Sequence, residues 1–447
     1  MLKRLLNFLP RSRPQAIHQV IPRDQHTISR RDISKSALKV MYGLSEAGFE
    51  AFLVGGGVRD LLLGDHPKDF DVATNATPEQ VKQLFRSARI IGRRFKIVHV
   101  RFGREVIEVT TFRDSHSDES QGSKHSARSE HGMLLRDNVY GDIRSDAIRR
   151  DFTVNALYYT LEQFSIHDFT GGIQDLTARR IRIIGDPEVR YQEDPVRMLR
   201  AVRFAAKLDF EIDSATAEPI LRLGHLLGNI PPARLFEEFL KLFMGGYASS
   251  VFPLLVEYRL LQYLVPAAHK TLQQDPSGHA RKLIEIALQS TDRRIASDQP
   301  VTPAFIFAAL LWQPLQERES RLKADGMPGL QAHQQAEQDV TGQQLQATSI
   351  PRRFSQVTRE IWDLQERLSR REGNRAERSF EHPRFRAAYD FLLMREQSGE
   401  ELQGLGDWWT QYQSVSVDER LKMVAQLAPP KGKRKRRRPR RKPIDHH

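Results

Sequence analysis

The chain has 447 residues, of which 39% are hydrophobic and 28% charged, as in a globular protein of about two to four domains. It contains no cysteine, which excludes disulfide bonds and thiolate metal sites and is typical of a reducing cytosol, so we expect a cytoplasmic protein. The longest apolar run, Ala304 to Trp312, is well short of the roughly 18 to 20 residues that a membrane span needs.

The net charge of +13 is concentrated near the C-terminal end of the sequence. The segment KGKRKRRRPRRK, Lys431 to Lys442, carries ten positive charges in twelve residues, which leaves only +3 on the rest of the chain. A segment without apolar residues cannot form a core, so we expect 429–447 to be a disordered basic tail. Its charge favours a polyanionic partner, either a nucleic acid or an anionic membrane, over a purely solubilising role.

Residues 1–32 have the composition of a flexible leader. Its first ten residues, MLKRLLNFLP, could form a weak amphipathic anchor, so the leader and the basic tail are both candidates for peripheral membrane contact. A helix is expected to follow over 33–48, with Ser34 as its cap and Gly48 at its end.

The next hundred residues predict alternating strands and helices. Thr77 followed by Pro78 is the preferred start of a helix, here TPEQVKQLFRSA. The polar segment 114–132 is expected to be a mobile loop. Four strands are expected in this part of the chain, in the segments EAFLVGG, KDFDVAT, FKIVHVRFG and EVIEVTTFR.

Beyond about residue 187 the pattern becomes almost entirely helical, with few β-branched runs. The sequence therefore predicts an α+β protein, in which a small mixed β-sheet at the N-terminal end precedes helical domains.

Two aspartates separated by one residue, Asp69 and Asp71, end the stretch VGGGVRDLLLGDHPKDFD. Side chains at i and i+2 of a strand share one face about 6.5 to 7 Å apart, where two carboxylates repel unless a cation lies between them. Glu108, on the polar face of a nearby strand, is a candidate third carboxylate. Divalent cations with such oxygen ligands support phosphoryl transfer; a solvated surface pair is the alternative.

The glycines of this stretch predict a phosphate-binding turn. Gly55 and Gly56 lie between a strand and a short helix, where backbone N–H groups can approach a ligand closely. We expect Arg59, one turn later, to contact a triphosphate and Asp60 to orient it. The alternative is a tight turn that only ends the strand, since neither of the two standard glycine-rich phosphate motifs is present.

With two further motifs, this stretch resembles the class II nucleotidyltransferases, which comprise bacterial poly(A) polymerases and tRNA CCA-adding enzymes. The further motifs are RRDFTVNALYY, Arg149 to Tyr159, and EDPVRMLRAVRFAAKL, Glu193 to Leu208. The resemblance extends over roughly residues 33–245. It implies Mg²⁺-dependent, template-independent addition of nucleotides to RNA 3′ ends.

The resemblance also implies the domain organisation. A five-stranded nucleotidyltransferase head would span 33–160 and a helical neck with the nucleotide-selecting helix 161–270. A helical body with an RNA-binding region would span 271–428.

The segment SDAIRRDFTVNALYY looks helical, with Ser145 as its cap and with Asp151 and Asn155 on one face. By resemblance it lines the nucleotide site, so that Arg149 or Arg150 would contact phosphate and Asp151 the ribose or the catalytic centre. Whether Glu108 or Asp151 is the third catalytic carboxylate stays open.

In the third motif, Asp194 can cap a helix whose arginines recur every three residues beside an apolar stripe. The resemblance assigns Asp194 and Arg197 to the base edge, and Arg200 and Arg203 to the triphosphate or to supporting contacts. Adenine and cytosine both present an amino donor beside a ring acceptor, so these residues alone cannot separate ATP use from combined CTP and ATP use.

Three segments favour a poly(A) polymerase that adds AMP from ATP to mRNA and other RNAs. They are IIGRRFKIVHV (Ile90 to Val100), IPPARLFEEFLKLFMGG (Ile230 to Gly246) and the basic tail, since phosphate contacts carry no sequence information. Such polyadenylation would promote RNA processing and decay, and RNA-decay machinery is a possible partner. The alternatives are a CCA-adding tRNA nucleotidyltransferase and a non-catalytic RNA-binding protein on the same scaffold.

Overall fold

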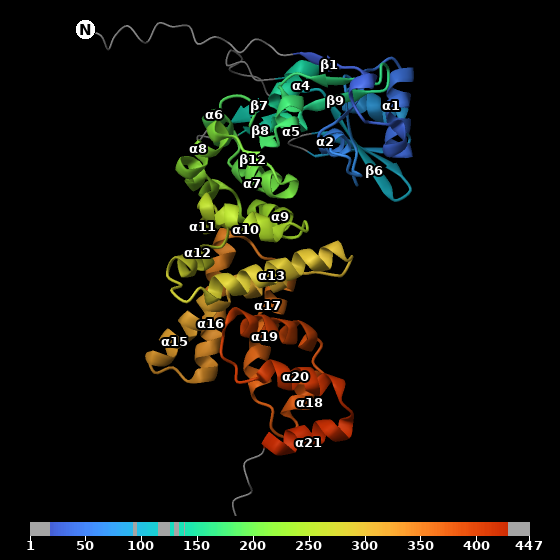
Figure 1. Cartoon of the computed structure of the whole chain (residues 1–447). Helices are drawn as coiled ribbons and strands as arrows, with labels where there is room; N and C mark the ends of the chain where they lie inside the picture. Colours follow the sequence, from blue (N-terminus) through green and yellow to red (C-terminus); the bar gives the residue numbers. More distant parts are fainter. Residues whose placement is uncertain (1–17, 93–95, 115–125, 129–133, 138, 428–447) are drawn as a thin grey trace, which may run out of the picture. The chain divides into compact units, whose positions relative to one another are not determined.

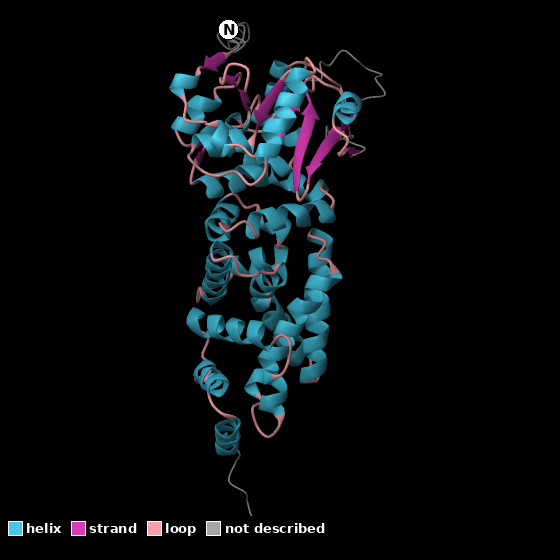
Figure 2. Ribbon diagram, turned by 90° about the vertical axis from the view of Figure 1, so that its right-hand side faces the viewer, coloured by secondary structure: helices cyan, strands magenta, loops and turns pink. Residues whose placement is uncertain are grey.

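The computed structural model describes residues 18–92, 96–114, 126–128, 134–137 and 139–427 (Figure 1). The chain divides into two compact units, the first containing Met1–Leu242 and Ser250–Tyr263 and the second containing Phe243–Ser249 and Leu264–His447. The main sheet belongs to the first unit, and the described part of the second is helical (Figure 2). The α+β class predicted from the sequence is therefore confirmed.

The main sheet has the strand order β1-β10-β9-β2-β3-β6-β5-β4. Strand β3 pairs antiparallel with β2 and parallel with β6, so it is central to the sheet. The described sheet has eight strands, not the five that the resemblance implied. They are β1 (Gln19–Ile21), β2 (Ala51–Val54), β3 (Asp71–Thr74), β4 (Ala88–Ile91), β5 (Ile97–Phe102), β6 (Glu105–Thr111), β9 (Leu157–Thr160) and β10 (Ile166–Asp168).

Strand β1 lies inside the segment predicted to be a flexible leader. It pairs antiparallel with β10, with Gln19 opposite Asp168. Ile21 is buried by this pairing, and burial of an apolar side chain favours the ordered strand. The predictions for residues 1–17 and for the basic tail at 429–447 concern residues outside the described part of the chain.

Two helices of the sheet domain begin where the sequence predicts. Helix α1 (Lys35–Glu46) is capped by Ser34, whose hydroxyl accepts the Ala37 N–H at 3.1 Å. Helix α3 (Pro78–Leu84) begins with a reciprocal capping box between Thr77 and Gln80. Within the predicted loop 114–132, most residues lie outside the described part of the chain, but Ser126–Arg128 form the short strand β7, which pairs with β8 (Leu134–Asp137) just after that segment.

The predicted helix over SDAIRRDFTVNALYY is wrong beyond its first half. Helix α4 (Ile143–Arg149) is capped by Asp142, while Ser145 occupies the third helical position of the same capping box. Arg150 is extended, with ψ 167°, and a 3₁₀ turn (Thr153–Asn155) leads directly into β9. The β-branched and aromatic residues after Asp151 favour this strand, where they become buried in the sheet.

The first unit contains further helices, of which α9, α10 and α11 have end residues that belong to the second unit. In α7 (Val196–Leu208) the predicted apolar stripe is confirmed, because Val196, Leu199 and Val202 are fully buried. The residue at the N-cap of α7 is Pro195 and not Asp194 as predicted, although the backbone N–H of Val196 donates to Asp194 Oδ1 at 3.3 Å. The other helices here are α2 (Gly56–Leu62), α5 (Gly172–Thr177), α6 (Pro187–Glu193), α8 (Ser214–Leu223), α9 (Pro232–Phe243), α10 (Ala248–Glu257) and α11 (Leu261–Leu264), with a small sheet formed by β11 (Arg180–Ile181) and β12 (Glu211–Ile212).

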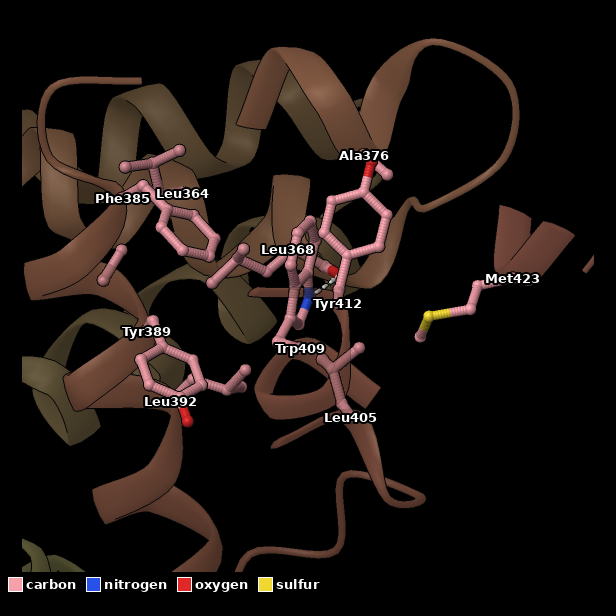
Figure 3. Packing of buried hydrophobic residues seen from close by; sticks show 11 residues of the cluster. Leu364, Leu368, Ala376, Phe385, Tyr389, Leu392, Leu405, Trp409, Tyr412 and Met423 are labelled. Atoms are coloured by element: carbon pink, nitrogen blue, oxygen red, sulfur yellow. Dashed lines mark hydrogen bonds between the residues drawn. The ribbon is translucent and has the colours of Figure 1, made fainter. Parts of the chain in front are cut away.

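The second unit is built from ten helices in its described part. A cluster of aromatic and aliphatic side chains forms one of its cores, and Trp409 at its centre donates its indole N–H to the Leu368 carbonyl at 3.0 Å (Figure 3). Across the described residues, no helix combines the length and the apolar character that crossing a membrane would require. The helices are α12 (Pro266–Gln273), α13 (His279–Ala296), α14 (Pro303–Leu310), α15 (Trp312–Ala324), α16 (Gly329–Ala347), α17 (Arg352–Ser369), α18 (Arg375–Phe380), α19 (Phe385–Ser398), α20 (Leu405–Ser414) and α21 (Val417–Leu427).

Candidate active site

Three carboxylates gather at one end of the central strand β3. The strand begins at Asp71, so Asp69 lies just before it and not inside it as predicted. In the parallel pairing of β3 with β6, Asp71 is directly opposite Glu108. Because side chains at paired positions share a face, this register brings the Glu108 carboxylate beside that of Asp71.

The glycine turn lies against the same carboxylate. Val54, the last residue of β2, is paired with Asp71, so the chain enters the turn next to it. Gly55 has φ of +73°, a conformation that side chains disfavour. A Cβ at Gly55 would lie 3.6 Å from Arg150 Nη1 and 3.8 Å from Asp71 Oδ2, so the turn packs between the guanidinium and the carboxylate.

The charges of the three carboxylates fit a divalent cation. Burial raises the pKa of Asp71 to about 6; the negative charges of Glu108 and Asp69 add to this effect, and Arg150 opposes it. His99 Nε2 is 3.2 Å from Glu108 Oε1. Carboxylate oxygens are the ligands that Mg²⁺ prefers, and a bound cation would offset their mutual repulsion.

A buried polar network joins the three sequence motifs. Asp60 accepts two hydrogen bonds from Arg59, at 2.8 and 2.6 Å, and Arg59 also donates to the Asn155 side chain. Asn155 donates to Asp151 at 3.3 Å, and the other oxygen of Asp151 accepts two bonds from Arg200. The glycine motif, the Asp151 segment and α7 are thus connected through side chains.

This network shows how two predicted site residues are used. Arg59 is only 2% exposed, with its guanidinium held by Asp60 and Asn155, and a direct triphosphate contact stays a prediction. Although burial opposes it, pairing with Arg200 lowers the pKa of Asp151 to about 2. Asp151 is therefore an anion bound to a cation of the protein.

Arg150 is fixed beside the glycine turn by two buried groups. It donates to the Tyr158 hydroxyl at 2.8 Å and to Asp146 at 3.1 Å, and Tyr158 donates to the same Asp146 oxygen at 2.6 Å. Sequence reasoning missed Asp146 and Tyr158, since neither carries a motif signal apart from its spacing to Arg150.

Several arginines crowd together near Arg149. Burial first, and then the charges of Arg113, Arg190 and Arg197, lower the pKa of Arg149 to about 10. Burial and the charge of Arg197 lower the pKa of Arg190 to about 10 as well. Partly buried cations that depress one another's pKa in this way form an environment that favours an anion.

Arg190 was missed from the sequence although it lies four residues before Asp194. Its guanidinium donates to the carbonyls of Arg149 and Arg150 at 2.6 Å each, so it holds the bend between α4 and the extended residue that follows. Glu193 accepts from Arg190 and from Arg197, at 2.8 and 3.0 Å. The feature of the sequence that could have pointed to Arg190 is the charged run before Asp194, to which Arg190 belongs.

The predicted base-reading residues lie at the start of α7. Asp194 Oδ2 accepts a hydrogen bond from Arg234 of α9 at 2.7 Å, and Arg197 donates to the Arg190 carbonyl at 2.7 Å. The guanidinium carbon of Arg203 lies 4.7 Å from the ring centre of Phe204. The roles of these residues in base choice stay predictions.

This sheet, with its paired carboxylates, glycine turn and basic group, defines a nucleotidyltransferase. Three family models match the chain: Poly A polymerase head domain over residues 51–182, Probable RNA and SrmB-binding site of polymerase A over 209–272, and Polymerase A arginine-rich C-terminus over 325–443. Poly(A) polymerase I of Escherichia coli is 51% identical over 435 residues, which cover 96% of this chain and 93% of that protein. The chain belongs to the bacterial poly(A) polymerase family.

CCA-adding enzymes, the other members of the resembled class, are also among the relatives of this chain. The CCA-adding enzyme of Lactobacillus helveticus is 39% identical over 261 residues, covering 58% of this chain and 63% of that enzyme. A crystal structure of tRNA nucleotidyltransferase with a primer tRNA and an incoming ATP analogue shares the fold. It has a TM-score of 0.58 and 22% identity and covers 87% of this chain and 99% of that one.

Proposed function

We propose that the protein is a polynucleotide adenylyltransferase, in which an RNA 3′-hydroxyl attacks the α-phosphate of ATP, AMP is transferred and pyrophosphate leaves. The observation that carries this proposal is the placement of Asp71, Glu108 and Arg150 around the Gly55 turn. At one end of the sheet, the carboxylates would bind a metal cation and the Arg150 guanidinium would contact phosphate. Phosphoryl transfer requires both kinds of group.

Asp69, Asp71 and Glu108 would hold Mg²⁺. When bound, the cations would favour deprotonation of the attacking hydroxyl and offset the charge of the triphosphate. Glu108 is the better candidate for the third carboxylate, because Asp151 already accepts hydrogen bonds from Arg200, the Phe152 N–H and Asn155. The role that we propose for Asp151 is to position Arg200 and Asn155 beside the nucleotide.

The arginine group around Arg149 would bind the triphosphate. Replacing Arg149 with glutamine should raise KM for ATP about tenfold to a hundredfold, since a charge-assisted hydrogen bond contributes about 1.5 to 3 kcal/mol. The measurement is initial rate against ATP concentration at saturating RNA primer. Arg144→Gln is the matched control, because Arg144 lies exposed on the same helix α4 and should leave KM unchanged. An unchanged KM for Arg149→Gln would remove Arg149 from the site.

The second candidate function is CCA addition, and the start of α7 does not exclude it. Asp194 and Arg197 can accept from an amino group and donate to a ring nitrogen, which fits adenine and cytosine alike. The AMP-adding function is supported by the extent of the similarity, since poly(A) polymerase I matches nearly the whole chain whereas the CCA-adding relative matches 58% of it.

RNA would be held in part by the basic tail, Lys431 to Lys442. Each phosphate neutralised on a single strand adds about −0.7 to the slope of log affinity against log salt. If four or five of the ten charges engage at once, a chain ending at Pro430 should show a slope shallower by about 3. Affinity should fall equally for different RNA sequences. Primer binding at several salt concentrations tests this, and identical slopes for both chains would assign the tail to another role.

Four further proposals rest on sequence reasoning alone. They are a cytoplasmic location, a role in mRNA processing and decay, contact with RNA-decay machinery, and weak membrane contact through the leader or the basic tail.

The proposed reaction is tested by its stoichiometry. Full-length protein, ATP and Mg²⁺ are incubated with an RNA primer that ends either in a 3′-hydroxyl or in a 3′-deoxynucleotide. We expect one pyrophosphate released for each AMP incorporated on the first primer, and neither product on the second. Release of phosphate or pyrophosphate without primer extension would contradict adenylyl transfer.

A further inference from the structure

A second cluster of potential metal ligands lies in the helical unit, between α16 and α17. His333 and Glu337 are one turn apart on α16, and Asp363 reaches them from α17. His333 Nε2 is 3.6 Å from Glu337 Oε1 and 3.7 Å from Asp363 Oδ1. One donor atom from each residue lies within 4.8 Å of the other two.

Two of these side chains are buried with unsatisfied polar atoms. His333 is 5% exposed and Glu337 is 7% exposed. Neither His333 Nε2 nor Glu337 Oε1 has a hydrogen-bond partner. Buried polar atoms in native proteins are nearly always satisfied, and each one left without a partner costs free energy, so this pair requires an explanation.

The tautomer of His333 makes Nε2 an electron-pair donor. Its other ring nitrogen, Nδ1, lies 2.8 Å from Glu319 Oε2, a carboxylate that also pairs with Lys323. In the neutral ring Nδ1 therefore carries the proton and donates to Glu319. The Nε2 lone pair then faces two carboxylates, and a bound cation would satisfy all three groups at once. A histidine held through its second nitrogen by a carboxylate is the usual arrangement of metal-binding imidazoles.

The separations fit a metal-bridged cluster better than a hydrogen-bonded one. Distances of 3.6 and 3.7 Å are too long for hydrogen bonds. Ligand bonds of about 2.0 to 2.2 Å in tetrahedral geometry place donor atoms about 3.3 to 3.6 Å apart. The Asp363 side chain is 40% exposed, and His333 and Glu319 line a cavity of about 320 Å³, so an ion has a path from solvent.

The charges around Glu337 are compatible with a bound cation. Burial and the charge of Asp363 raise the pKa of Glu337 to about 7, while His333 and Arg359 act against this rise. Arg359 lies one turn before Asp363, and among the described residues it makes neither a hydrogen bond nor an ion pair with Glu337.

We propose that His333 Nε2, Glu337 and Asp363 bind a divalent transition-metal ion of the Zn²⁺ class, with water at the remaining position. One imidazole with two carboxylates is a donor set that suits zinc better than magnesium. The ion would tie α16 to α17, with Glu319 of α15 fixing the histidine. The proposed site shares no residue with the catalytic carboxylates, which lie more than 200 positions earlier in the sequence.

The site is tested with Zn²⁺ alone on the full chain, in an Asp71→Asn background that weakens metal binding at the catalytic carboxylates. Calorimetric titration is compared for this protein, for a second carrying His333→Gln and for a third carrying His225→Gln, an exposed histidine of the first unit. We expect one equivalent of Zn²⁺ to be lost in the His333 variant only. At a hundredfold excess over Kd, Zn²⁺ should raise the Tm of the helical unit by about 5 to 10 °C, and this shift should disappear with His333→Gln.

Asp363→Asn is the second variant, since its partly exposed side chain tolerates replacement even if His333→Gln does not fold. It should weaken Zn²⁺ binding at least tenfold while the metal-free Tm stays unchanged. Equal Zn²⁺ stoichiometry and an equal Tm shift in Asp71→Asn, its His333→Gln derivative and its Asp363→Asn derivative would overturn the proposal.

Discussion

Replacing Asp71 with asparagine is expected to lower AMP incorporation by about a thousandfold or more, while RNA binding persists. Asp71 is the carboxylate that faces Glu108 across the β3–β6 pairing and lies beside the Gly55 turn. Removing its charge removes a ligand from the proposed Mg²⁺ site, and metal assistance contributes several kcal/mol to such reactions. The measurement is single-turnover extension of an RNA primer, together with primer affinity.

Asp65→Asn is the matched control, because Asp65 is an exposed carboxylate in the same connection between α2 and β3. It should leave turnover unchanged. A folded Asp71→Asn protein with near-normal AMP incorporation would show that the catalytic carboxylates lie elsewhere.

Breaking the Asp151–Arg200 pair should have the second large effect, this time on stability as well as activity. The two side chains are 12% and 31% exposed, and Asp151→Ala leaves the Arg200 guanidinium without its carboxylate. Removing one partner of a largely buried ion pair costs about 3 to 5 kcal/mol in the free energy of unfolding. Arg200→Ala should cost a similar amount, and the double variant less than the sum of the two.

The pH dependence of this contribution follows from the lowered pKa of Asp151. The folded pKa is about 2, against about 3.9 for an unperturbed aspartate. The stabilisation is therefore present above about pH 4 and is lost as the pH falls towards 2. Asp151→Ala should remove this acid dependence from the unfolding free energy.

The exposed pair Arg222–Glu188 is the control for the stability prediction, and Glu188→Gln should change stability little. Additive losses in the double variant would show that Asp151 and Arg200 are not coupled.

The features of the fold that could be predicted from the sequence are short, local patterns. The Ser34 and Thr77 caps and the apolar stripe of α7 are set by neighbouring residues, and each is present as predicted. The Asp151 segment was mistaken for a helix because its charged spacing is helical, whereas burial of Tyr158 and Tyr159 in the sheet decides its conformation.

Contacts between distant segments could not be predicted in the same way. The pairing of Asp71 with Glu108 depends on the register of β3 against β6, and the carbonyls held by Arg190 belong to residues 40 and 41 positions earlier. The binding of Asp151 by Arg200 likewise joins residues 49 positions apart. No spacing rule connects such residues before the fold is known.

The central claim, that ATP is the substrate on arbitrary RNA ends, is tested most directly by supplying each nucleoside triphosphate separately. The full chain is given a generic RNA primer and, in parallel, a tRNA that lacks its CCA end. We expect long A tracts with ATP on both primers and little incorporation of CMP, GMP or UMP. Addition confined to the tRNA, with CTP required first and extension ending after C-C-A, would contradict the account and identify a CCA-adding enzyme.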